Sequence, residues 1–248
     1  MKIRNTLVIL ATAILGSAAV VPSGKAQVTI YDNTENFTGF SFSNAGATTG
    51  NKNTYLVADD LTYNPLLALA PVTSFEFSLS NSNTTTQGIM ANVLFYDSNG
   101  TGGGPGTLLA SFTFNPISLA TNSVTVVTAT LTPLQYFTLP TDGTIWAGIF
   151  FSTSTGQSSP ILNKFGQGLF NPPTVGTSQD ELFYSTGLGP TGSNPAGTIY
   201  SSPFGANPPA NFGWQLSTTV VPEPASAALF IVGGLGLLLA VQRRRTAR

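Results

Sequence analysis

The sequence predicts an all-β fold, an antiparallel β-sandwich of jelly-roll type, with an apolar segment at each end of the chain. Short runs rich in Val, Ile, Thr, Phe and Tyr alternate with clusters of Gly, Pro and Asn, which is the composition of strands and turns. Between the two ends no long stretch has the periodicity of an amphipathic helix. The 248 residues are enough for one domain with a large core. We therefore expect an N-terminal signal peptide, one β domain and one C-terminal transmembrane helix.

Residues 1–26 have the pattern of a secretory signal peptide. Lys2 and Arg4 precede the apolar run Leu7–Val21, and small residues follow it. We expect signal peptidase and the export machinery to act here, with cleavage after Ala26; cleavage after Ala19 is the alternative. An uncleaved anchor helix would need a longer apolar run than this one.

Residues 27–217 are predicted to form the β domain. Ser74–Leu79 alternates strictly between polar and apolar residues, as a strand does when one face lies in the core and the other in water. The predicted strands are Val28–Tyr31, Tyr55–Leu61, Val72–Leu79, Ile89–Tyr96, Leu108–Phe114, Val124–Leu131, Ile145–Phe151, Glu181–Tyr184 and Phe212–Ser217. The Gly-, Pro- and Ser-rich segments Ser152–Ser178 and Thr186–Pro209 are predicted to be surface loops. Strands of this length with turns between them favour an antiparallel sandwich.

The segment 218–248 has three parts in a fixed order. They are the triplet Pro222, Glu223 and Pro224, the uncharged apolar stretch 225–241, and the basic tail 242–248 with Arg243, Arg244 and Arg245. At a rise of about 1.5 Å per residue the apolar stretch is ~25 Å long, enough for a thin bilayer core. A buried globular helix is the alternative, but it would have a polar face. The arginines should remain cytoplasmic, which places residues 27–217 outside the cytoplasmic membrane.

This order of triplet, apolar stretch and arginine cluster resembles the PEP-CTERM sorting domain, over about a tenth of the chain. The resemblance implies recognition in the membrane by an exosortase, a transpeptidase-like enzyme, and cleavage near Pro222, Glu223 and Pro224. In that family the triplet and the arginines are a recognition signal in a substrate, not a catalytic site. Such proteins accompany exopolysaccharide and biofilm production. The resemblance therefore implies a surface or extracellular-matrix protein with a structural or adhesive role.

The charge and the missing residue types exclude several other functions. Residues 27–221 contain two lysines, no arginine and nine acidic residues, a formal charge of 2 − 9 = −7. A domain this acidic has no basic surface for a nucleic-acid backbone. The chain has no His and no Cys, so catalytic triads that need them and thiolate zinc sites are unavailable. A mechanism with two carboxylates stays open, but we expect no enzymatic activity and no cofactor.

Calcium is one ligand that the residues of the domain allow. Asp97 and Asn99 in a glycine-rich loop, or Asp59 with Asp60, offer oxygen ligands of the kind that calcium prefers. The spacing of an EF-hand is absent, and Asp and Asn in such loops commonly serve only to form the turn.

Carbohydrate is the other ligand to consider, and it defines the alternative function, a lectin-like module of the cell envelope. Tyr200 and Phe204 lie in a predicted loop, where their rings would be available to stack on the sugars of an exopolysaccharide. Trp146 and Trp214 lie in strand-like runs, so we expect them in the core.

Overall fold

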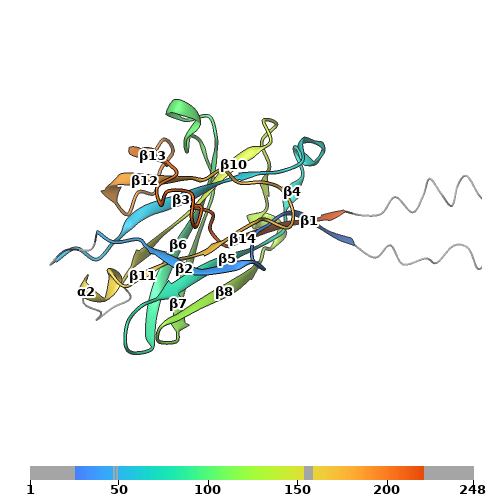
Figure 1. The fold of residues 1–248 in the computed structure, drawn as a ribbon. Helices are drawn as coiled ribbons and strands as arrows, with labels where there is room; N and C mark the ends of the chain where they lie inside the picture. Colours follow the sequence, from blue (N-terminus) through green and yellow to red (C-terminus); the bar gives the residue numbers. More distant parts are fainter. Residues whose placement is uncertain (1–25, 47, 49, 154–158, 221–248) are drawn as a thin grey trace, which may run out of the picture. The chain divides into compact units, whose positions relative to one another are not determined.

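The computed structural model describes residues 26–46, 48, 50–153 and 159–220, and Val28–Thr218 form one compact unit in it. This unit is built almost entirely of antiparallel strands packed as a sandwich (Figure 1). The predicted signal peptide up to residue 25, the sorting triplet, the apolar stretch 225–241 and the basic tail lie outside the described residues. Within the described ranges, no helix has the length and apolar character needed to cross a membrane.

Two six-stranded sheets make up the sandwich. The first sheet has the order β1 (Ala26–Asp32), β14 (Trp214–Val220), β5 (Ser74–Asn81), β11 (Phe165–Phe170) and β2 (Phe37–Ser43), and β8 (Ser123–Thr130) pairs with the opposite edge of β5. The second sheet has the order β13 (Gly197–Ser201), β12 (Glu181–Leu188), β3 (Tyr55–Thr62), β10 (Thr144–Ser152), β6 (Gln87–Asp97) and β7 (Leu108–Leu119). The short strands β4 (Pro71–Val72) and β9 (Phe137–Thr138) pair with each other.

Aromatic side chains from both sheets meet in the main core. Phe75 and Phe77 on β5, Phe95 on β6 and Trp214 on β14 are all buried, because each occupies the inward position of an alternating strand. The Phe95 ring lies 5.1 Å from that of Phe75 and 5.7 Å from that of Trp214, each pair edge-to-face. These contacts across the sheets favour the sandwich by removing large apolar surfaces from water. The burial of Trp146 and Trp214 agrees with their predicted core positions.

The second sheet also has a buried cluster on its outer face. Leu56, Leu94, Trp146 and Phe183 belong to this cluster and are at most 4% exposed. The Trp146 indole N–H donates a 2.8 Å hydrogen bond to the carbonyl of Gly103, in the loop between β6 and β7. That loop therefore covers the outer face at this point, and the second sheet is apolar on both sides.

Each predicted strand has a counterpart in the structure, but some loop predictions were wrong. The predicted loop Ser152–Ser178 contains β11 and the short helix α2 (Ser159–Leu162), and the predicted loop Thr186–Pro209 contains β13. The sequence also gave no indication of β2. All three of these strands contain glycine, which weakens the strand signal. β2 and β11 also pair with each other across more than 100 residues, whereas β13 pairs with the preceding strand β12.

Candidate functional site

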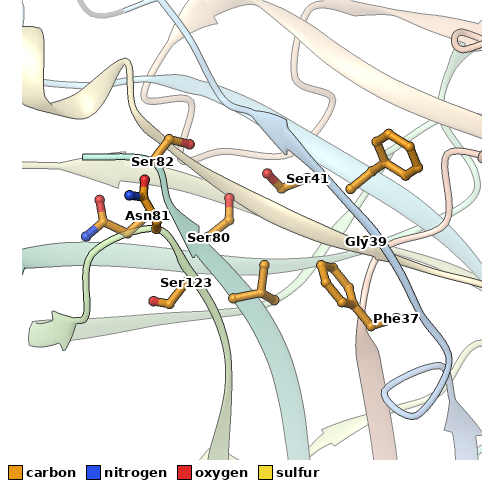
Figure 2. A pocket seen from close by; sticks show the side chains of 10 residues that line it. Phe37, Gly39, Ser41, Ser80, Asn81, Ser82 and Ser123 are labelled. Carbon is orange, nitrogen blue, oxygen red and sulfur yellow. The ribbon is translucent and has the colours of Figure 1, made fainter. Parts of the chain in front are cut away.

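An open hollow lies on the outer face of the first sheet, and we call it the outer hollow. Its volume is about 290 Å³, near the lower end of the range for small-molecule sites, ~300–1,000 Å³. It is lined by Phe37, Gly39, Phe40 and Ser41 of β2, Ser80, Asn81 and Ser82 at the end of β5, and Asn122, Ser123 and Val124 at the start of β8. Figure 2 shows Phe37 and Ser41 on one side and Ser80, Asn81, Ser82 and Ser123 on the other.

The sequence of β11, the strand between β2 and β5, allows the two walls of the outer hollow to lie close together. Phe165, Gln167 and Leu169 are buried, and the Gln167 amide donates a 3.1 Å hydrogen bond to the Val57 carbonyl of the other sheet. Gly168, which alternates with Gln167 and Leu169, therefore faces the outer side of the sheet and carries no side chain. A Cβ at Gly168 would lie 2.7 Å from Val124 and 3.5 Å from Phe37. Glycine here thus allows side chains from both walls to approach across the strand.

Two phenylalanines give the outer hollow an aromatic wall. Phe37 is 47% exposed and Phe40 is 58% exposed, so about half of each side chain is accessible to a ligand. The Phe37 ring is supported by Phe170, with the two ring centroids 5.3 Å apart. Gly39, between the two phenylalanines, has a φ of +89°, a conformation that glycine adopts at little cost. This bend in β2 interrupts the strand alternation near the hollow.

Hydroxyl and amide groups form the rest of the lining. No hydrogen bond involves the side chains of Ser41, Ser82 or Asn122 in the described part of the chain, so their polar atoms are free to bind a ligand. Asn81 instead has a structural role, because its amide donates to the carbonyls of Leu119 and Ala120. None of the ten lining residues is ionisable. The chemistry of the outer hollow is thus aromatic and neutral-polar.

The most buried charged groups of the domain are Asp59 and Asp60 on β3. One Asp59 carboxylate oxygen accepts a 2.6 Å hydrogen bond from the Phe212 backbone N–H, and the other accepts one of 3.0 Å from the Ser178 hydroxyl. Asp60 accepts from the Gln179 backbone N–H at 3.1 Å. The two carboxylates therefore tie β3 to two segments that lie far along the chain.

Burial changes the protonation of both groups. It is the largest cause that raises the pKa of Asp59 well above its ordinary value of 3.8, and the charge of Asp60 raises it further. Burial also raises the pKa of Asp60, while the hydrogen bond from Gln179 opposes that shift. Adjacent strand positions direct the two side chains to opposite faces of β3. No group of three or more acidic residues suited to hold a metal ion occurs in the described part of the chain.

The calcium candidates Asp97 and Asn99 lie in the loop after β6. The Asn99 amide donates to the carboxylate of Asp97 at 3.1 Å and to the Thr107 hydroxyl at 3.0 Å, and its carbonyl accepts from the Thr107 N–H at 2.8 Å. These bonds close the loop, which is the turn-forming role considered from the sequence. Burial and the nearby Asp142 raise the pKa of Asp97.

The two predicted sugar-stacking residues lie apart from the outer hollow. Tyr200 is on β13, at the edge of the second sheet, and is 49% exposed. Phe204 packs against the main core, with its ring 5.4 Å from that of Phe42. Ala26, the predicted cleavage residue, is the first residue of β1. The triplet Pro222, Glu223 and Pro224 and the arginines Arg243, Arg244 and Arg245 lie outside the described residues.

Sequence reasoning missed the outer hollow because its parts come from three separate segments. The one local signal was Phe165-Gly166-Gln167-Gly168, in which bulky or polar residues alternate with glycine. That alternation is typical of a strand whose outward face lacks side chains.

Comparisons with known proteins add little to this description. No protein-family model and no curated protein matches the chain. Among solved structures, a chain from the crystal structure of the T13 IBDV viral particle is similar over 89% of this chain and 47% of its own length. The identity is 14% and the TM-score is 0.26, so this likeness carries no argument about fold or function.

Proposed function

We propose that the chain is an exported protein of the cell surface or extracellular matrix, anchored in the cytoplasmic membrane as a precursor and processed there by an exosortase. The observation that carries this proposal is the order of the Pro-Glu-Pro triplet, the 17 uncharged residues 225–241 and the arginine cluster. Proline restricts φ and disfavours helix in the residue before it, a property that favours an extended and accessible cleavage site.

The proposed role of the β domain is structural or adhesive, with a link to exopolysaccharide or biofilm. Its surface supports this role, since it stays hydrated through Ser, Thr and Asn rather than through ions, and charged residues make up only 8% of the chain. Within the sandwich class we propose a jelly-roll type. Repeated crossings between the sheets support it, for example from β5 to β6 and from β7 back to β8.

A lectin-like module is the second candidate function. The observation that favours it is the outer hollow, where two half-exposed phenylalanines lie beside unpaired hydroxyl and amide groups. Tyr200 and Phe204 do not form a common platform, because the Phe204 ring is packed against Phe42.

Mass spectrometry of the mature C-terminus, in envelope and medium fractions of the native host, tests the first proposal. We expect a terminus near Pro222–Pro224 without the arginine tail. A variant with Glu223→Ala should keep the tail, whereas Glu35→Ala, a change at an exposed carboxylate of the β domain, should be processed normally. An intact Arg248 in the unaltered protein would overturn processing by an exosortase.

A further inference from the structure

We propose that the outer hollow binds a neutral glycan, with the rings of Phe37 and Phe40 stacking on pyranose faces. This inference names the ligand class for the second candidate function and is independent of how the C-terminus is processed. It rests on the composition of the hollow, on its exposure and on the fixed position of its walls.

The apolar part of the site suits the face of a sugar ring. A pyranose presents C–H groups on its faces and hydroxyls around its edge, so it needs a flat apolar surface beside hydrogen-bonding groups. Phe37 and Phe40 both line the hollow, and each leaves about half of its area in water, 47% and 58%. Exposed apolar side chains that are rimmed by polar residues commonly mark a ligand-binding surface.

The polar part of the site matches the edge of the sugar. The hydroxyls of Ser41 and Ser82 and the amide of Asn122 can each donate and accept, as glycan hydroxyls also do. Because these three side chains make no hydrogen bond within the described chain, a ligand would not have to displace an internal partner. A site of this kind gains affinity from a few directed hydrogen bonds beside an apolar contact.

The absence of ionisable groups among the lining residues selects against charged ligands. The ten lining residues carry no carboxylate, ammonium or guanidinium group. A phosphate or carboxylate ligand would lose hydration on binding here without gaining a countercharge. We therefore infer a neutral polysaccharide rather than a polyuronate or a phosphorylated ligand.

The walls of the outer hollow are held in place before any ligand binds. Phe170, which is 4% exposed, supports the Phe37 ring at a centroid distance of 5.3 Å. On the opposite wall, the Asn81 amide is fixed by the carbonyls of Leu119 and Ala120. Because the wall side chains are already ordered, less conformational entropy is lost when a ligand binds, which favours recognition of a sugar by a shallow site.

Affinity electrophoresis of the full-length protein in detergent tests the proposal. Separate gels would contain a neutral polymer, either a soluble glucan such as dextran or a galactomannan. A polyuronate would serve as the charged comparison. We expect retardation by at least one neutral polymer, little dependence on salt, and little retardation by the polyuronate.

The variants Phe37→Ala and Phe40→Ala should each weaken binding by about tenfold, and the double variant should abolish it, as expected for aromatic anchors. Tyr200→Ala is the matched control, because Tyr200 is similarly exposed, at 49%, but lies on the other sheet. Ser41→Leu, which would fill the hollow and keep both phenylalanines, should also abolish binding. Circular dichroism and thermal unfolding would verify that each variant is folded.

Three results would overturn the proposal. The first is the absence of retardation by every neutral polymer, and the second is equal retardation of the wild type and the folded double variant. The third is loss of self-association in the double variant without any glycan binding, which would assign the surface to a second copy of the chain. None of these results bears on the C-terminal processing, which the mass of the mature protein tests separately.

Discussion

The buried carboxylate of Asp60 should make the β domain less stable as the pH rises. Burial raises the pKa of Asp60 from an ordinary 3.8 to about 7, so the folded state binds the proton more tightly than the unfolded state does. The resulting stabilisation is complete below about pH 4 and is lost as the pH rises to about 7. At about 1.4 kcal/mol per pKa unit, this loss amounts to about 4 kcal/mol.

The substitution Asp60→Asn should remove most of this pH dependence. Asparagine has the same shape as aspartate but never ionises. Its carbonyl oxygen can still accept the hydrogen bond from the Gln179 N–H, which is 3.1 Å long with Asp60. We therefore expect the variant and the wild type to be similarly stable near pH 4. Above about pH 7 the variant should be more stable, by up to about 4 kcal/mol, which corresponds to a Tm difference of about 10 °C.

Thermal unfolding followed by circular dichroism between about pH 4 and pH 8 would measure the effect. Glu35→Gln is the control, because Glu35 is exposed, and it should leave the profile unchanged. Asp59→Asn should act in the same direction as Asp60→Asn, since burial also raises the pKa of Asp59. A wild-type Tm that increases from pH 4 to pH 7 would refute the reasoning, because it would mean that the buried carboxylates are stabilised as anions.

Three further predictions concern packing and the edges of the sheets. Phe95→Ala should lower the free energy of unfolding by about 3–5 kcal/mol in urea titrations, because the ring contacts Phe75 and Trp214. Leu134→Ala is the control, since Leu134 is 99% exposed, and a change of more than about 0.5 kcal/mol for it would contradict the assigned burial. Asn33→Ala should lower the free energy of unfolding by about 2 kcal/mol in the same assay, since the Asn33 amide donates to two buried backbone carbonyls at 2.9 and 3.1 Å. An unchanged urea midpoint would show that these hydrogen bonds are dispensable. Val126→Lys should slow aggregation measured by light scattering, because β8 is an uncharged strand that, among the described strands, pairs only with β5. Equal aggregation rates would exclude this edge as the point of association.

The strands that the sequence predicted are those whose side chains alternate clearly. Ser74–Leu79 is an example, because Phe75, Phe77 and Leu79 are buried in the core, while Ser74 and Glu76 are only partly buried. In such a strand the local pattern and the tertiary environment agree, so the pattern alone is enough. β11 and β13 lie in segments that the sequence predicts as loops, since glycine lowers strand propensity. β11 pairs with strands more than 80 positions away, and β13 pairs with β12 across a loop.

The sequence by itself determined the class of fold, the acidic charge of the domain, the absence of His and Cys chemistry, and the order of motifs that suggests export and sorting. Each of these depends on composition or on residues close together in the chain. Only the tertiary structure determined the outer hollow and the burial of Asp59 and Asp60. The hollow combines β2, the end of β5 and the start of β8 across the glycines of β11, and Asp59 is bonded to Phe212, 153 residues away. Contacts between residues so far apart in the chain arise from the packing of the sheets, and a local sequence pattern does not predict them.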